Sequence, residues 1–182
     1  MLFDTSFKIQ IVTDRKLFGT NTLINEFIQK LTKTDTLDGG WATKYIDHST
    51  GRYWIKYVVD DRNFFENLMM VSPPPTTEEL IDIALSSLHI DEVSAAATRL
   101  YLEEQTDKRE YRQKLINTLI QLDVAHLGKS ERERLRTIIQ ASQLTDRVNK
   151  RDIVGKHFSE IQKVAEFFNA IADRAQEILN RL

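Results

Sequence analysis

Two acidic turns contain the side chains best suited to proton transfer. Asp47 and His48 lie in one predicted turn, and Asp60, Asp61 and Arg62 lie in the next. A carboxylate beside an imidazole can act as a general acid or base when both converge in a cleft. We expect the two turns at opposite ends of a β-hairpin, which favours solvated turn residues. A hydrolase or transferase that uses His48, Asp60 or Asp61 between the sheet and the helices is the alternative function.

Other catalytic and metal-binding patterns are absent from the sequence. There is no cysteine, which excludes disulfides, thiolate metal sites and cysteine nucleophiles. Gly39-Gly40 lacks the Lys-Ser/Thr pair of a phosphate-binding loop and precedes a predicted strand. The histidines are scattered, so no metal centre is expected: His48, His89, His126 and His157. The sequence therefore predicts no cofactor and no catalytic residue, and it favours a non-enzymatic protein.

Two arginine-rich segments raise the question of nucleic-acid binding. Residues 131–136 interleave Glu131 and Glu133 with three arginines, and the acidic side chains would repel phosphate. Residues 147–151 are basic but include no aromatic side chain for stacking on a base. Both segments are more typical of solvated helix faces. Association with nucleic acid through residues 129–151 is the third functional hypothesis, and we consider it unfavoured.

Aromatic and basic side chains alternate in residues 52–57. In a β-strand this alternation places Arg52, Trp54 and Lys56 on one face. Such a face suits protein binding, because Trp and Arg are enriched at the centres of interfaces. A Trp54 packed beneath a neighbouring helix explains the same residue, and the sequence favours this second interpretation.

Charge is distributed unevenly along the chain. The net charge of the whole chain is −2, but residues 77–105 carry −6 and residues 106–182 carry +4. The simplest interpretation is that oppositely charged helices attract each other. The alternative is an acidic surface for a partner protein with a basic surface, because single-sign surfaces steer association. The acidic residues of this surface would be Glu78, Glu79, Asp82, Asp91, Glu92, Glu103 and Glu104.

The only prolines, Pro73, Pro74 and Pro75, divide the chain into a strand-rich part and a helical part. Before them, alternating apolar residues predict a strand over residues 7–12, and β-forming residues bounded by turns predict strands over 41–46, 52–59 and 64–71. A helix is expected over residues 21–33 and a polar loop over 34–40. A small antiparallel sheet with one helix on a face buries these apolar stripes. We therefore predict a β-sheet part over residues 1–75.

Residues 76–182 show the periodicity of helices. The first helix begins at Thr76, and its apolar residues up to Leu88 predict that it is largely buried. Further helices are expected after Asp91, Asp107 and Gly128, each beginning at a capping signal. The sequence therefore predicts an all-helical bundle or a short HEAT-like helical stack, and an α+β fold overall.

The last predicted helix has an apolar seam that repeats every three or four residues. Its members are Phe158, Ile161, Ala165, Phe168, Ala172, Ala175, Leu179 and Leu182. This seam could pack inside the chain or join two copies of it as a homodimer. The proline segment lacks the polar flanks of a flexible tether, so we expect a short, stiff corner that holds the two parts together.

Composition favours a cytoplasmic protein without a membrane segment. No apolar run approaches the roughly 20 residues that span a bilayer, and residues 1–4 do not resemble a signal peptide. With no catalytic pattern, an acidic block and stacked helices, we expect a protein that binds another protein. A small bacterial inhibitor or immunity-type protein, which occludes its partner, is the specific form of this hypothesis.

Overall fold

The computed structural model describes residues 15–60, 62–107, 109–149, 155 and 157–182. The chain divides into two compact units, Met1–Thr76 and Thr77–Leu182. The first unit contains an antiparallel sheet with a helix, and all regular elements in the described part of the second are helices, which confirms the predicted α+β fold. The strand predicted over residues 7–12 lies outside the described residues. The stiff proline corner and the packing of the two units on each other stay predictions.

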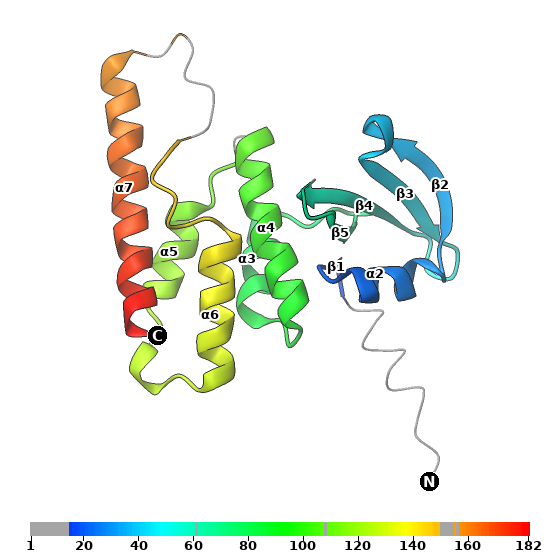
Figure 1. Cartoon of the computed structure of the whole chain (residues 1–182), viewed down its shortest axis with the longest axis horizontal. Helices are drawn as coiled ribbons and strands as arrows, with labels where there is room; N and C mark the ends of the chain where they lie inside the picture. Colours follow the sequence, from blue (N-terminus) through cyan, green and yellow to red (C-terminus); the bar gives the residue numbers. More distant parts are fainter. Residues whose placement is uncertain (1–14, 61, 108, 150–154, 156) are drawn as a thin grey trace. The chain divides into compact units, whose positions relative to one another are not determined.

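The first unit is a five-stranded antiparallel sheet with one helix (Figure 1). Its elements are β1 (Leu17–Phe18), α2 (Asn21–Ile28), β2 (Thr32–Leu37), a 3₁₀ turn (Asp38–Gly40), β3 (Ala42–Asp47), β4 (Arg52–Asp60) and β5 (Phe65–Met70). The strand order is β1-β5-β4-β3-β2, so β4 lies at the centre and β2 forms an edge. Because β2, β3, β4 and β5 are each paired with the next in sequence, short turns suffice to connect them.

The core of this unit lies between α2 and the sheet. Ile24 and Phe27 lie three residues apart on one face of α2, and both pack towards Trp54 of β4. The rings of Phe27 and Trp54 are in edge-to-face contact with centroids 4.8 Å apart, and Phe18 stacks on Phe27 at 4.7 Å. Such offset and edge contacts are the favoured aromatic geometries. The aromatic cluster therefore fixes α2 on the sheet.

The segment that follows Ile28 differs from the prediction. We expected helix 21–33 and a loop over 34–40, but α2 ends at Ile28 and residues 32–37 form strand β2. Thr32, Thr34 and Thr36 favour a strand because their β-branched side chains fit an extended backbone. All but the last residue of β2 are exposed, so the strand shows no alternation of apolar and polar residues. Leu31 still contacts the core from beyond the helix.

The second unit is an irregular bundle of five α-helices (Figure 1). They are α3 (Thr77–Ser86), α4 (Ile90–Thr106), α5 (Arg112–Ile120), α6 (Lys129–Ala141) and α7 (Phe158–Arg181), with a 3₁₀ turn, η2 (Val124–His126), before α6. α3 packs on α4, but α4 then packs on α6 and α5 on α7. A HEAT-like stack would pair helices in sequence order, so the bundle alternative describes this unit. The buried Ala95, Ala96 and Ala97 of α4 allow close helix packing.

Two helix boundaries differ from the prediction. α3 ends at Ser86, so Leu88 lies in the turn before α4 and is 90% exposed instead of buried. α5 begins at Arg112, several residues after the predicted start at Asp107. Arg109 bonds instead to the side chain of Glu103 at the end of α4, at 3.2 Å. This ion pair holds Arg109 against α4, and α5 begins only at Arg112.

The apolar seam of α7 is used only in part. Phe168, Ala172 and Ala175 are buried in the bundle, whereas Phe158 and Ala165 near the start of the helix are exposed. The second half of the seam therefore packs within the chain, and a homodimer through the first half stays a prediction. In the described part of the chain, no helix combines the length and apolar character needed to cross a bilayer.

Candidate functional site

The predicted binding face on β4 is largely occupied by contacts within the sheet unit. Trp54 is 2% exposed and lies beneath α2, as the favoured interpretation of this residue expected. The ammonium group of Lys56 forms an ion pair with Glu66 on β5 at 2.9 Å. Arg52 is half-buried at the hairpin end of β4. The structure therefore corrects the proposed role of Trp54 as a partner-binding residue, because its side chain contributes to the core.

The acidic block of residues 77–105 is mostly engaged inside the helical unit. Glu92, Glu103 and Glu104 are buried. Glu92 accepts a hydrogen bond from the hydroxyl of Ser87, and Glu103 forms ion pairs with Arg99 and Arg109. A buried carboxylate is stable only when hydrogen bonds and opposite charges compensate it. These three residues cannot contribute to an exposed acidic surface, and the predicted partner-binding role of all three is corrected.

The remaining acidic residues of the block lie closer to solvent. Glu78 and Asp82 are exposed, and Glu79 and Asp91 are half-buried on α3 and α4. The Glu78 carboxylate pairs with the Lys114 ammonium group at 2.8 Å, and this hydrogen bond lowers the pKa of Glu78 below its ordinary value. The acidic surface is therefore much smaller than the sequence suggests. Most of the acidic block is buried or paired with basic side chains inside the helical unit.

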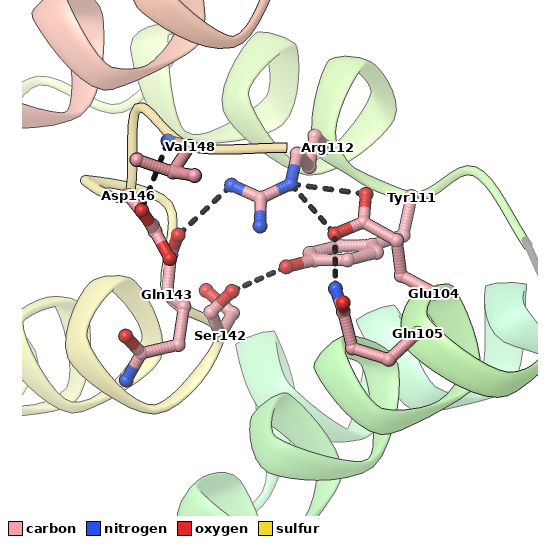
Figure 2. A network of polar contacts seen from close by, with 8 residues as sticks. All are labelled: Glu104, Gln105, Tyr111, Arg112, Ser142, Gln143, Asp146 and Val148. Carbon is pink, nitrogen blue, oxygen red and sulfur yellow. Dashed lines mark hydrogen bonds and ion pairs between the residues drawn. The ribbon is translucent and has the colours of Figure 1, made fainter. Parts of the chain in front are cut away.

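Glu104 and Arg112 form the centre of a buried polar network (Figure 2). The Arg112 Nε donates to both carboxylate oxygens of Glu104, at 2.9 and 3.0 Å, and its Nη1 donates to the carbonyl of Gln143 at 2.8 Å. The guanidinium carbon lies 4.5 Å from the ring centroid of Phe168 on α7. The network therefore joins the ends of α4, α5 and α6 to α7.

Tyr111 extends this network without creating a reactive group. Its hydroxyl donates to the carbonyl of Ser142, and burial raises the pKa of Tyr111 far above its ordinary value. A phenol of this kind stays protonated at neutral pH and cannot act as a base. Because Tyr111 and Arg112 are each 1% exposed, no substrate reaches them in this conformation. The network is a structural junction.

The two acidic turns of the sheet unit do not form a shared site. Asp47 begins the β3–β4 turn and pairs in register with Arg52, whereas Asp60 ends β4. The nine residues of β4 separate the two carboxylates by roughly 26 Å at about 3.3 Å per residue. Asp61 lies outside the described residues. The two turns are thus at opposite ends of the hairpin, as predicted, and acid–base chemistry that needs both is excluded.

Each of these carboxylates is engaged in its own turn. Burial alone would raise the pKa of Asp47, but hydrogen bonds from Ser49 and Thr50 outweigh it and lower the pKa. A hydrogen bond from the Asn63 side chain lowers the pKa of Asp60. Both groups are therefore ionised at neutral pH and stabilise their turns.

Metal and nucleic-acid sites receive no support from the geometry. Within the described ranges, no three histidine or acidic side chains come together as metal ligands. Arg132 donates to the carbonyls of Ala125, Leu127 and Leu182, and Arg134 to that of Leu85. Arg147 pairs with Asp173 on α7. These arginines fasten helix ends to one another, which leaves them poorly placed for phosphate contacts.

One end of the helical unit carries the features expected of a binding surface. We define the α5–α6 end as the α3–α4 turn (residues 87–89), the α5–α6 connection (residues 121–128) and the last turns of α7 (Figure 1). The hydrogen bonds of Arg132 and Arg134 tie these segments together. Leu88, Ile90 and Ile120, at or beside this end, are 90%, 47% and 44% exposed. Large exposed apolar side chains at one end of a unit are candidates for an interaction surface.

Two grooves flank the α5–α6 connection. The first, of about 440 Å³, lies between α5, η2 and α7 and is lined by Ile120, Val124, Arg174, Glu177, Ile178 and Arg181, among others. The second, of about 190 Å³, is more apolar and includes Leu85, Leu122, Leu127 and Leu135. The segment of residues 117–124 contributes to both. The surface of the α5–α6 end therefore has two grooves separated by residues 117–124, and it is partly apolar.

The residues of this surface escaped prediction from the sequence. Leu88 continues the apolar pattern of α3, so the periodicity alone assigned it to the core. The preceding Ser86-Ser87 was the available signal for the helix end, because serine competes with the helical backbone for hydrogen bonds. The Ser86 hydroxyl indeed donates to the carbonyl of Asp82. Arg174 and Arg181 lie seven residues apart, a spacing that places both on one helix face.

Comparison with known proteins gives no relative for this chain. No protein-family model matches it, and no curated protein or solved structure shows significant similarity to it.

Proposed function

We propose that the protein is not an enzyme and acts by binding another protein at the α5–α6 end of its helical unit. The observation that supports this proposal is the exposure of Leu88, Ile90 and Ile120 at an end that also carries two grooves. Covering a fully exposed leucine side chain stabilises a complex by about 1.5–3 kcal/mol. A partner that buried these side chains would therefore gain a substantial part of the binding free energy from them.

The fold does not require these apolar side chains. Leu88 lies outside both α3 and α4, and its side chain is 90% exposed, so it contributes little to the core of the unit. An apolar residue at such a position exposes surface that water hydrates unfavourably. Contact with a partner would explain an exposed leucine at this position, whereas the folding of the unit does not require it.

Within this class we propose that binding blocks the partner, as an inhibitor or immunity-type protein does. One observation argues against catalysis, and a second favours binding by a rigid surface. The candidate acid–base residues Asp47 and Asp60 are each engaged in a separate turn. The α5–α6 end is held by hydrogen bonds to helix-end carbonyls, so it meets a partner with little loss of conformational freedom.

Site-specific photo-crosslinking tests the proposal. A photoreactive amino acid replaces Leu88 in one sample and Gln140, exposed near the C-terminal end of α6, in a matched control. In lysate of the source organism, we expect one protein to be crosslinked through position 88 and not through position 140. Excess wild-type chain should compete for this product, and a Leu88→Asp chain should not.

The captured protein is then purified and its affinity measured by calorimetry. Leu88→Asp should weaken binding by about tenfold or more, because it places a charge where an apolar contact was. Its unfolding midpoint should equal that of the wild type. Equal crosslinking through positions 88 and 140, or equal affinity of the Leu88→Asp chain, would contradict the proposal.

A further inference from the structure

We infer that the groove between α5 and α7 binds an acidic segment of the partner protein, with Arg174 and Arg181 as the side chains that contact its carboxylates. This inference rests on the proposed protein-binding function and specifies the chemistry of the partner. The groove holds about 440 Å³, which lies within the range of roughly 300–1,000 Å³ typical of ligand sites. It therefore has room for several side chains of a bound segment.

Both arginines are available to a ligand. They are exposed, and neither guanidinium forms a hydrogen bond or ion pair with another described residue. This separates them from Arg132, Arg134 and Arg147, whose donors are used within the chain. A guanidinium presents parallel N–H donors that match a carboxylate, so two such groups with unused donors form a carboxylate-binding pair.

The spacing of the two arginines defines what fits. Seven residues along α7 correspond to two helical turns, a rise of about 10.5 Å, and both side chains emerge on nearly the same face. Two carboxylates separated by a similar distance, such as acidic residues seven apart on a helix, can pair with both at once. One carboxylate would engage only one of them.

The floor of the groove selects for an apolar component. Leu119, Val124 and Ile178 line it and are themselves almost completely buried. Ile178 lies between the two arginines in sequence, so an apolar side chain between two acidic ones meets an apolar surface. Glu177 also lines the groove and repels a dense negative charge. The groove therefore suits an amphipathic acidic peptide better than a highly charged polymer.

A nucleic-acid strand fits this groove less well. Its phosphates form a continuous negative charge that would meet Glu177, and binding of single strands usually includes stacking on aromatic side chains. Among the described residues that line the groove, none is aromatic. We therefore infer a protein segment as the ligand, and binding of an RNA oligonucleotide is an outcome that the test distinguishes.

This inference reverses the partner charge expected from the sequence. The acidic block of residues 77–105 predicted a basic partner, but Glu92, Glu103 and Glu104 are buried and compensated within the unit. Arg174 and Arg181 form no ion pair with another described residue, and they outnumber Glu177, the acidic residue that lines the same groove. Complementarity at the α5–α6 end therefore calls for an acidic partner surface.

Selection of peptides from a random phage-displayed library on the immobilised full chain tests the inference. Selected peptides are then synthesised, and their affinities are measured by fluorescence anisotropy. We expect enriched peptides with at least two acidic residues around an apolar one. Arg174→Glu with Arg181→Glu should weaken their binding about tenfold or more, whereas Arg174→Lys with Arg181→Lys should retain part of it. Glu177→Gln should strengthen binding a few-fold.

Several results would overturn the inference. These are no enrichment, enrichment of peptides without acidic residues, unchanged affinity of the double glutamate variant, or binding of an RNA oligonucleotide in preference to the peptides. Circular dichroism and thermal unfolding should show that the variants fold as the wild type does, since both arginines are exposed. If the partner captured through Leu88 binds the double glutamate variant normally, the inference fails while the proposed function stands.

Discussion

The Nε atom of Arg112 lies 2.9 Å from a carboxylate oxygen of Glu104, and neither side chain is more than 1% exposed. An ion pair enclosed in this way is costly to break, because the remaining charge stays buried without a partner. Arg112 also contacts the carbonyl of Gln143 and the ring of Phe168, so one side chain holds parts of four helices together.

The first prediction concerns this pair. Glu104→Leu and Arg112→Met should each lower the free energy of unfolding by about 3–5 kcal/mol, because each leaves a buried charge without its partner. Glu104→Leu combined with Arg112→Met removes both charges and should cost less than the sum of the single changes. Chemical denaturation of the four proteins measures the coupling. Additive effects would show that the two side chains do not interact energetically.

The second prediction concerns Trp54. Trp54→Ala should lower the free energy of unfolding by about 3–5 kcal/mol, because it leaves a cavity between Phe18, Phe27 and the sheet. Tyr53→Ala is the matched control, since Tyr53 is the next residue of β4 and is partly exposed. Tyr53→Ala should lower the free energy of unfolding much less than Trp54→Ala does. Denaturation followed by circular dichroism distinguishes the two, and equal losses would contradict the placement of Trp54 in the core.

The third prediction concerns Asn67 on β5, which is fully buried. Neither its amide nitrogen nor its amide oxygen has a hydrogen-bond partner in the described structure. A buried polar group left in this way costs about 1–3 kcal/mol. Asn67→Leu should therefore raise the free energy of unfolding by up to about that amount, since leucine has a similar size. Asn180→Leu on the exposed side of α7 should have little effect, and destabilisation by Asn67→Leu would show that the amide has a partner.

The fourth prediction concerns the ionisation of Asp47. Its pKa should lie below the ordinary value of 3.8, because the hydrogen bonds from Ser49 and Thr50 favour the carboxylate more than burial disfavours it. Since the pKa is lower in the folded state, these bonds stabilise the fold at pH values above the unfolded pKa. The contribution is lost as the pH falls through the folded pKa.

Carbon-detected NMR titration of the carboxyl groups measures this pKa directly. Ser49→Ala with Thr50→Val should raise the pKa of Asp47 and leave that of Asp60 unchanged, because Asp60 depends on Asn63 and Arg62. If the pKa of Asp47 does not move in the double variant, the turn hydrogen bonds are not its cause.

The fifth prediction concerns the two halves of the α7 seam. Ala172→Asp should lower the free energy of unfolding by several kcal/mol, because it introduces a carboxylate without a partner at a buried position. Ala165→Asp, one heptad earlier on the same seam, lies at an exposed position and should be tolerated. Thermal unfolding of both variants checks this difference. Comparable destabilisation by Ala165→Asp would indicate that the first half of the seam is also covered, for example by a second copy of the chain.

The sequence predicted the elements whose apolar residues face one core. The spacing of Ile24 and Phe27 marked α2, because burial imposes a period on a helix face, and β-forming residues bounded by turns marked β4 and β5. It did not predict β2, whose side chains are nearly all exposed, so nothing selects alternating polarity there. The β-propensity of the three threonines was the remaining signal for a strand, and it is a weaker predictor than the periodicity of apolar residues.

The proposed binding surface was harder to predict than the fold. A list of acidic residues does not reveal which carboxylates are buried, and three of seven in the acidic block proved to be so. Charge alone also does not reveal the partners: Glu103 pairs with Arg99 on its own helix, whereas Glu104 pairs with Arg112 of the next helix, eight residues away. Leu88 shows the opposite case: it continues the apolar spacing of α3, but it lies beyond the end of this helix and is exposed.

Strand β2 has a consequence for how partners can approach the sheet unit. It lies at the edge of the sheet, carries Lys33 and Asp35 at exposed positions, and is interrupted by a bulge between them. A foreign strand that added to this edge would have to bury charged side chains and match an irregular ladder. The edge therefore resists β-augmentation and amyloid-like stacking by a foreign strand.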